Sequence, residues 1–197
     1  MLARPGEVWK TEQLSRAAKV SLGQISNVRN LLLTQEWAEE RSPGFALTRP
    51  KPLLEQWASS YRFDRNPVAQ CYAMQSVGEV EARLAELCDR DGVGYALTGF
   101  SGAARYASFT TYRTAAAYVA GDVDRIVEQI GGKRVSTGAN LQLITPYDDG
   151  VFFERKVFDG QTAAAPIQCY LDLQHETARG AEAAEALLGS VIEPSWQ

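Results

Sequence analysis

Two short helical segments separated by only two residues constrain the N-terminal part of this chain more than any other feature. The first follows Thr11, a good N-cap residue, and carries a small apolar stripe of leucine and alanine. After Lys19 and Val20, Ser21 and Gln24 form a capping box, S-x-x-Q, which satisfies two backbone N–H groups at the start of the second segment. Two short helices joined in this way are typical of a helix-turn-helix.

The second segment lies in the stretch SLGQISNVRNLLLTQEW, and its polar side chains are unusual for an exposed helix. At about 100° per residue, Ile25, Val28 and Leu32 form the predicted buried stripe, with Leu22 close by. The opposite side and its flanks carry Gly23, Gln24, Ser26, Asn27, Asn30 and Thr34. Because Asn and Gln make bidentate hydrogen bonds to adenine edges, this face predicts base contacts in a DNA groove. An ordinary solvated face that is rich in amides is the alternative.

A Pro-Gly turn follows the second helix. Ser42-Pro43-Gly44-Phe45 fits a type II turn with Gly44 at positive φ, and the flanks WAEER and FALTR are short enough for a two-stranded hairpin. A hairpin directly after a helix-turn-helix predicts a wing. A closing helix follows, whose apolar face contains Leu53, Leu54, Trp57 and Tyr61. We therefore predict a winged helix-turn-helix over residues 1–62.

Basic side chains near these elements predict phosphate contacts. Arg29 lies at the edge of the buried stripe, while Arg41, Arg49 and Lys51 surround the hairpin, where ordinary surface charge is the alternative. The predicted DNA-binding residues are Ser21, Gln24, Ser26, Asn27, Arg29, Asn30, Arg41, Arg49 and Lys51. Residues 1–62 hold nine Lys/Arg and six Glu, a net +3, whereas residues 63–197 carry −7. This split is what a small DNA-binding domain joined to an acidic domain would show.

Residues 63–197 alternate strand-like and helix-like segments and predict a mixed α+β domain with its own core. VAQCYAM has strand composition, and a second capping box, Ser76-x-x-Glu79, opens a helix that Asp91-Gly92 ends. ERKVFDGQT predicts a hairpin with Asp159-Gly160 as its turn. The other predicted elements are the strands YALTG, AAAYVA and NLQLITP, the helices FSGAARYA, DVDRIVEQIGG, PIQCYLDL and RGAEAAEALLGSVI, and a turn or strand in DDGVFF.

Three patterns would indicate an enzyme, and each has a simpler interpretation. Gly99-x-Ser101 followed by Asp122-x-Asp124 faintly resembles the Mg²⁺-binding pattern of nucleotidyltransferases, but the gap is long and Asp122 is placed to cap a helix. Asp148-Asp149-Gly150 is more simply a turn, and His175, the only histidine, has no Ser or Cys motif to activate. We expect no catalytic residue, no metal and no cofactor.

Cysteine usage and hydropathy indicate the compartment. Cys71, Cys88 and Cys169 lie far apart without metal-ligand spacing and predict buried thiols. No apolar run approaches the roughly 18 to 20 residues that span a bilayer. The start, MLARPGEVWK, lacks the apolar core of a signal peptide. We expect a cytoplasmic protein that does not bind membranes.

The chain resembles a known family in the order winged helix, YALTGFSGAARYA, AYVAGDVDRIVEQIG, ITPYDDGVFF, APIQCYLDLQ and GAEAAEALL. It is similar, over nearly its whole length, to AbiEi-family antitoxins, the transcriptional-regulator partners of type IV toxin–antitoxin systems. The resemblance implies a repressor that binds repeats in double-stranded DNA upstream of its own operon. It also implies a nucleotidyltransferase-like toxin, which the antitoxin counteracts without necessarily forming a stable complex.

On this hypothesis the acidic second domain mediates self-association on DNA or neutralises the toxin. Two alternatives stay open. One is a nucleotide-binding or nucleotidyltransferase-like enzyme whose winged helix contacts proteins. The other is an assembly module in which the amide face packs against a partner.

Overall fold

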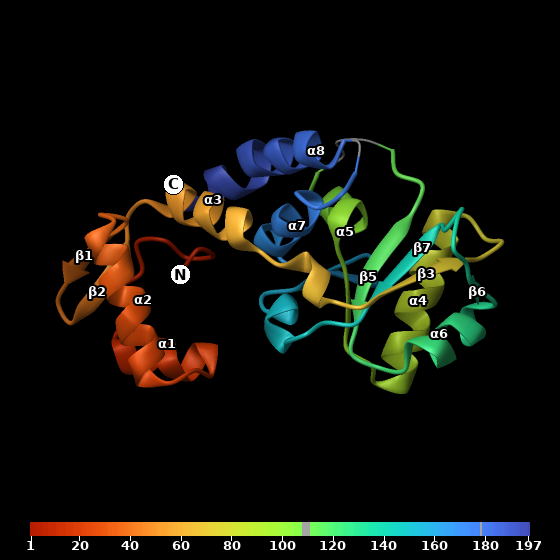
Figure 1. The fold of residues 1–197 in the computed structure, drawn as a ribbon, viewed down its shortest axis with the longest axis horizontal. Helices are drawn as coiled ribbons and strands as arrows, with labels where there is room; N and C mark the ends of the chain where they lie inside the picture. The colour runs from red at the N-terminus through yellow and green to blue at the C-terminus, as the bar shows by residue number, and fades with distance from the viewer. Residues whose placement is uncertain (108–110, 178) are drawn as a thin grey trace. The chain divides into compact units, whose positions relative to one another are not determined.

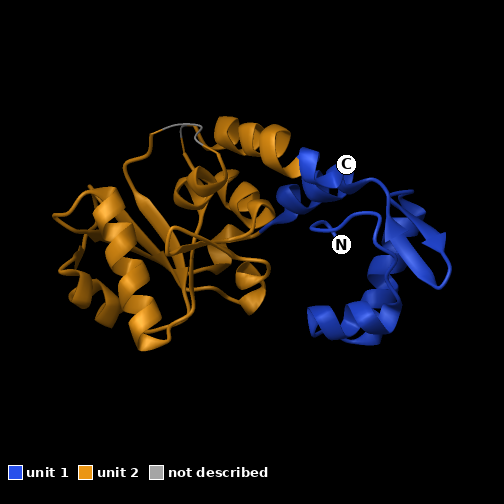
Figure 2. Ribbon diagram, turned by 180° about the vertical axis from the view of Figure 1, so that it is seen from behind, with its two compact units in different colours: residues 1–61, 193–197 blue, residues 62–192 orange. Residues whose placement is uncertain are grey.

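The chain folds into two compact units in a computed structural model (Figures 1 and 2), which describes residues 1–107, 111–177 and 179–197. Unit 1 comprises Met1–Tyr61 together with the C-terminal segment Glu193–Gln197, and unit 2 comprises Arg62–Ile192. Within the described ranges, every helix is too short or too polar to cross a bilayer.

Unit 1 contains three α-helices and a hairpin. In chain order its elements are α1 (Thr11–Ala18), α2 (Leu22–Thr34), β1 (Ala38–Arg41), β2 (Gly44–Leu47) and α3 (Pro50–Ser60). The Ser21–Gln24 capping box predicted for α2 is present. The predicted start of α1 is wrong by one residue, because Lys10 is the N-cap and Thr11 is already helical. Lys19, in the left-handed conformation, ends α1 and opens the tight connection to α2.

The predicted hairpin is confirmed, but its predicted turn is wrong. β1 and β2 pair antiparallel with Arg41 opposite Gly44, so the loop consists of Ser42 and Pro43 alone. The Ser42–Pro43 peptide bond is cis, and Gly44 belongs to β2 without a positive φ. The turn therefore does not explain why position 44 is a glycine.

A close backbone contact with Trp9 explains the glycine at position 44. The Trp9 N–H donates to the Phe45 carbonyl at 2.8 Å, and the Phe45 N–H donates to the Trp9 carbonyl at 3.1 Å. A Cβ atom at Gly44 would lie 2.1 Å from the Trp9 carbonyl oxygen. Only glycine allows Trp9 to form this bridge on the side of β2 away from β1.

The apolar face of α2 differs from the predicted stripe. Ile25 and Leu32 are buried, but Val28 is 43% exposed and Leu22 is 51% exposed. The partly buried Arg29 lies one turn after Ile25 and about 40° to the side of it. Periodicity places several apolar positions near one another, but packing against α1 and the hairpin leaves only Ile25 and Leu32 buried, with the aliphatic stem of Arg29 beside them.

A seven-stranded mixed sheet, in the order β6-β3-β7-β5-β4-β9-β8, forms the centre of unit 2. Two of its pairs, β5 with β7 and β4 with β9, are parallel, and the other pairs are antiparallel. The strands are β3 (Val68–Tyr72), β4 (Tyr95–Leu97), β5 (Ala115–Val119), β6 (Lys133–Arg134), β7 (Leu141–Ile144), β8 (Lys156–Phe158) and β9 (Gln161–Ala163).

Helices cover both faces of this sheet (Figure 1). α4 (Val77–Asp91) and α6 (Val123–Ile130) pack on one face, and α5 (Gly99–Tyr106), α7 (Pro166–Leu173) and α8 (Gly180–Leu187) lie on the other side. The residues of β5 alternate between the two faces of the sheet and so show the two layers. Ala115, Ala117 and Val119 join the core beneath α4 and α6, while Ala116 and Tyr118 bond to side chains of α5 and α7.

The predicted α+β class is therefore confirmed, and most predicted elements of unit 2 are present. The Ser76–Glu79 capping box opens α4, and Gly92 ends it in the left-handed conformation. Asp159 and Gly160, both at positive φ, connect β8 to β9. DDGVFF, predicted as a turn or a strand, forms a short 3-10 helix over Asp149–Phe152.

Candidate nucleic-acid interface

The polar face of α2 is uncovered. Gly23, Gln24, Ser26, Asn27, Asn30 and Thr34 are all exposed. Within the described part of the chain, no hydrogen bond engages the side chains of Ser26, Asn27 or Asn30. Their donors and acceptors therefore remain available to a molecule that approaches from solvent.

Ser21 and Gln24 are engaged at the start of α2. The Ser21 Oγ accepts from the Gln24 backbone N–H at 3.2 Å, and the Gln24 Oε1 accepts from the Ser21 N–H at 3.0 Å. The Gln24 oxygen is thus used within the helix, and its amide NH₂ remains as the group that faces solvent. The structure assigns both residues a capping role that is separate from their predicted DNA contacts.

The chain around α2 is locally basic. From Gln13 to Gln35 there is no Asp or Glu, while Arg16, Lys19 and Arg29 add three positive charges. No acidic side chain occupies the first turn of α2, so the positive end of its helix dipole is not offset there. An anionic polymer would meet a favourable potential at this end of the helix.

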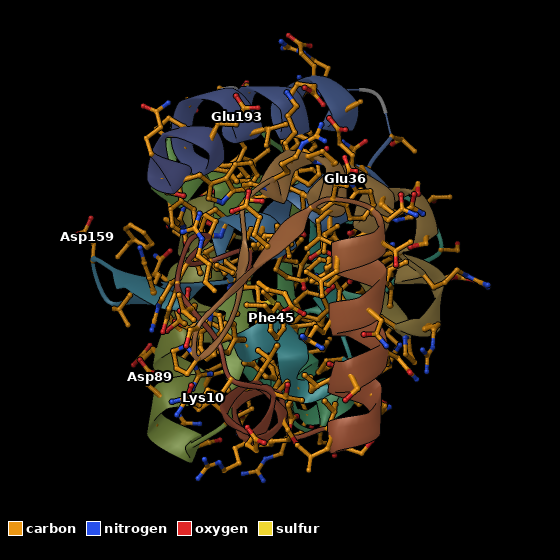
Figure 3. All side chains as sticks on the ribbon, turned by 90° about the vertical axis from the view of Figure 1, so that its left-hand side faces the viewer. Lys10, Glu36, Phe45, Asp89, Asp159 and Glu193 are labelled. Carbon is orange, nitrogen blue, oxygen red and sulfur yellow. The ribbon has the colours of Figure 1, made fainter. Side chains whose placement is uncertain are left out.

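Arg29 is turned toward the hairpin. Its guanidinium forms an ion pair with Glu40 of β1 and lies 5.9 Å from the centre of the Phe45 ring. Phe45, labelled in Figure 3, is fully buried. Arg29 therefore fastens α2 to the hairpin, and only a third of its side chain is exposed.

The other predicted phosphate-binding residues differ in their partners. Arg41 Nη2 lies 3.3 Å from a carboxylate oxygen of Glu39, and Lys51 Nζ lies 2.8 Å from one of Glu193. Arg49 is exposed just before α3. Both ion pairs lie at the surface, where such pairs contribute little and exchange readily.

The charge of unit 1 is smaller than the sequence division suggests. Arg62 belongs to unit 2 and Glu193 belongs to unit 1. Unit 1 therefore has eight basic and seven acidic residues, a net +1, and unit 2 has twelve and seventeen, a net −5. The positive excess is thus confined to the segment from Gln13 to Gln35, which carries +3, and the rest of unit 1 carries −2.

The residues that suggested an enzyme have structural roles in unit 2. The Asp122 Oδ1 accepts from the backbone N–H groups of Asp124 and Arg125 at 3.0 and 3.2 Å and caps α6. Asp124 pairs with Arg134 at 2.6 Å. The buried Ser101 Oγ accepts from the Ala116 N–H at 3.0 Å. These contacts account for the pattern without a bound metal.

The second acidic pattern and the histidine also have local roles. The Asp148 Oδ1 accepts from the Gly150 N–H at 2.7 Å, as expected for a turn. His175 stacks on Phe63 with ring centres 5.7 Å apart.

The three cysteines are free and buried, as predicted. Burial raises the pKa of the Cys71 thiol and raises that of Cys88 to about 12. Thiols that stay protonated at neutral pH are poor nucleophiles and poor metal ligands.

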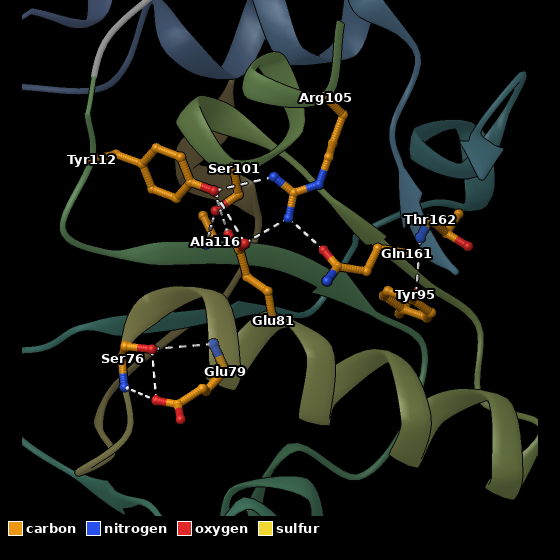
Figure 4. A network of polar contacts seen from close by, with 10 residues as sticks. All are labelled: Ser76, Glu79, Glu81, Tyr95, Ser101, Arg105, Tyr112, Ala116, Gln161 and Thr162. Atoms are coloured by element: carbon orange, nitrogen blue, oxygen red, sulfur yellow. Dashed lines mark hydrogen bonds and ion pairs between the residues drawn. The ribbon is translucent and has the colours of Figure 1, made fainter. Parts of the chain in front are cut away.

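A buried polar network holds part of unit 2 together (Figure 4). Arg105 of α5 bonds to Glu81 of α4 at 2.6 Å and also contacts Gln161 of β9. The Tyr112 hydroxyl lies 2.9 Å from Glu81 and 3.2 Å from Arg105. Sequence reasoning missed this network. The one available signal was an acidic residue, Glu81, between the apolar positions of α4.

A hollow of about 310 Å³ opens beside α5, and Tyr112, Gln142 and Glu176 are among the residues that line it. Burial raises the pKa of the Glu176 carboxyl. No hydrogen bond or ion pair joins that carboxylate to another described residue. The charged Glu176 carboxylate thus lowers the stability of the folded state locally and is not part of a hydrogen-bond network.

Comparison with known proteins gives one match. A family model described as "Transcriptional regulator, AbiEi antitoxin, Type IV TA system" matches residues 46–193, about three quarters of the chain. The matched range begins within β2 and contains α3 and the whole of unit 2. Comparison with curated proteins and with solved structures finds no match.

Proposed function

Because the chain belongs to the AbiEi antitoxin family of transcriptional regulators from type IV toxin–antitoxin systems, we propose that unit 1 is a winged helix-turn-helix that binds double-stranded DNA. In this proposal α2 enters the major groove, and the β1–β2 hairpin is the wing. Regulators of this kind act by binding, so the proposal assigns no catalytic residue.

The arrangement of unit 1 supports a winged helix. α1 and α2 are joined by a tight connection, and the hairpin follows α2 after a few residues. Trp9 extends the hairpin with a third extended segment on the far side of β2. A helix-turn-helix with a small antiparallel sheet is the combination that places one helix in a groove and a hairpin beside it.

The observation that carries the proposal is the exposed, unpaired amide face of α2. Asn27 and Asn30 have the donor and acceptor pair that matches an adenine edge, and Ser26 can bond to any base. Their side chains are exposed and free of bonds to other described residues. An ordinary solvated face would be expected to carry Lys and Glu, because those residues solubilise a helix at no cost in packing.

Arg49 would contact phosphates from beside the wing, while Arg29, Arg41 and Lys51 would first have to leave Glu40, Glu39 and Glu193. Charges of this kind position the protein on the duplex without selecting a sequence. The net +1 of unit 1 leaves few phosphate contacts. We therefore expect base contacts to supply much of the discrimination between one duplex and another.

For unit 2 we propose the role that the family description carries, counteraction of a cognate toxin. By family analogy, the toxin would be a nucleotidyltransferase-like protein encoded beside the regulator, and the operator would be a repeat upstream of both genes. Self-association on adjacent repeats would place two copies of unit 1 on one site.

The direct test is titration of the full chain with a duplex from its own upstream region and with a scrambled duplex, at about 50 and 200 mM salt. We expect tighter binding to the upstream duplex at both salt concentrations. Equal affinity for the two duplexes would contradict sequence-specific regulation.

Arg41→Ala tests the wing in the same titration. Loss of one phosphate contact should weaken binding to both duplexes alike and reduce the slope of log K against log salt by about one. Arg90→Ala, an exposed arginine of unit 2, is the matched control and should leave both affinities and the slope unchanged. A change in the affinity ratio of the two duplexes would show that Arg41 contacts bases instead.

A further inference from the structure

We infer that α2 reads A·T base pairs, with Leu22 contacting a thymine methyl group and Asn27 contacting an adenine of the same site. This inference rests on the proposed DNA-binding function and adds the chemistry of the site that is read. It includes a residue, Leu22, that helical periodicity placed in the core.

Leu22 is an exposed aliphatic residue at the position where a groove-binding helix contacts bases. It is the first residue of α2 and is 51% exposed. Ser26 and Asn30 follow it at intervals of four along one row of the helix surface, with Gly23 and Asn27 in the next row. Helices of helix-turn-helix proteins contact base edges mainly through their N-terminal residues.

The chemistry of this face matches one base pair. Thymine is the only base that presents a methyl group in the major groove, and apolar side chains recognise it. Adenine presents N7 and N6, which an Asn amide engages with two hydrogen bonds. Leu22 and Asn27 lie about 140° apart around the helix, at the two edges of an arc that Ser26, Asn30 and Gly23 fill. This arc therefore offers an apolar contact at one edge and an amide contact at the other, as a site of A·T pairs requires.

The same face lacks the side chain that most often reads guanine. Guanine O6 and N7 are both acceptors and are usually bound by Arg or Lys. Arg29 is the single cation within α2, two residues after Asn27 and thus about 200° around the helix. It is paired with Glu40 and lies near the Phe45 ring. Arg29 therefore lies about 20° beyond Leu22, outside the arc from Leu22 to Asn27, and that arc carries no cation.

The test begins with selection of duplexes from a random-sequence library by the full chain. Each thymine of the selected site is then replaced singly by deoxyuridine, which removes only the methyl group. We expect A·T pairs at the enriched positions and one thymine whose replacement weakens binding about fourfold, the loss expected for one buried methyl group.

Leu22→Ala should weaken binding to the thymine duplex by a similar factor and abolish the difference between thymine and deoxyuridine at that position. Val28→Ala is the matched control, because Val28 is 43% exposed on the same helix and lies almost opposite the middle of the arc between Leu22 and Asn27. It should retain wild-type affinity and the full deoxyuridine effect. Both variants replace exposed side chains, so unfolding curves should confirm that the fold is intact.

The outcomes separate this inference from the proposed function. If the chain enriches no duplex, both fail. If it enriches a site read through G·C pairs, or if no single deoxyuridine weakens binding, the inference is overturned and DNA binding stands. A Leu22→Ala variant that keeps the full deoxyuridine effect would also overturn it.

Discussion

Gly44 shows how one backbone contact decides a residue. The Cβ atom of alanine would lie 2.1 Å from the Trp9 carbonyl oxygen and 2.6 Å from its carbonyl carbon. Both are backbone atoms, which cannot move aside as the end of a side chain can. The Pro-Gly sequence indicated that glycine is needed at position 44, but it pointed to the turn as the reason. No local pattern indicates that Trp9 approaches from outside the hairpin.

Gly44→Ala should therefore destabilise unit 1 by about 3 kcal/mol, at the upper end of the range for overpacking. All four tryptophans, Trp9, Trp37, Trp57 and Trp196, belong to unit 1, so urea unfolding followed by tryptophan fluorescence reports on this unit. Gly23→Ala is the control. Its Cβ would meet nothing closer than 3.9 Å, and it should stabilise by about 0.5 kcal/mol through helix propensity. Equal effects of the two substitutions would contradict the steric account.

Glu176 gives a prediction about pH. Burial raises its pKa above the usual value for a glutamate. The folded state therefore binds the proton more tightly than the unfolded state, and the stability that this provides is lost as pH rises through the folded pKa. At pH 7 the charged carboxylate is a cost. Glu176→Gln should be more stable than wild type at pH 7, and the difference should shrink toward pH 4. Urea unfolding followed by circular dichroism checks this, and a difference that is constant with pH would contradict it.

At the scale of elements, caps were predictable from the sequence and buried faces were less so. The two capping boxes, Ser21 with Gln24 and Ser76 with Glu79, are local patterns that involve only the helix itself. Which apolar residues of α2 are covered depends on α1 and the hairpin, which both pack against it. Leu22 and Val28 were therefore assigned wrongly, whereas the exposed positions of Ser26, Asn27 and Asn30 agree with the predicted polar face.

The strands of unit 2 followed from composition and turn signals, but their order in the sheet did not. The parallel pairing of β5 with β7 brings together segments separated by α6 and β6, and no local pattern encodes that choice. The Glu81–Arg105 pair was unpredictable for the same reason. It joins α4 to α5, with Tyr112 and Gln161 added from further along the chain.

Arg105→Met should destabilise unit 2 by about 3 kcal/mol, because Glu81 is 1% exposed and would keep a buried charge without its cation. Arg83→Met removes a pair of similar length, 2.7 Å to Glu86, that lies at the surface, and should change stability by less than about 0.5 kcal/mol. Circular dichroism during urea unfolding compares them. Adding Glu81→Gln to Arg105→Met should recover part of the loss, and a purely additive double variant would count against the buried-charge explanation.

For the whole molecule, the C-terminal segment belongs with the N-terminal unit. Lys51 pairs with Glu193, and the Trp196 Nε1 donates to the Leu2 carbonyl at 2.8 Å. This return cannot be seen in the sequence. It adds Glu193 to unit 1, and because Arg62 belongs to unit 2, the charge of unit 1 falls from the +3 counted over residues 1–62 to +1. The division of charge between the two units has the predicted sign but a smaller contrast.

The family match and the DNA-binding proposal depend on different parts of the chain. The matched range starts at residue 46, so α1, α2 and β1 lie outside it. Family membership therefore supports a regulator that acts with a toxin, while the choice of α2 as the base-reading element depends on its exposed amides. Those amides must be tested directly.

The most direct measurement is the affinity of Asn27→Ala, beside wild type, for the upstream duplex and for a scrambled duplex at the same salt concentration. The variant should bind the upstream duplex more weakly by about 1 to 3 kcal/mol, with its affinity for the scrambled duplex unchanged. An Asn27→Ala variant that matches wild type on the upstream duplex would show that this face of α2 does not read DNA.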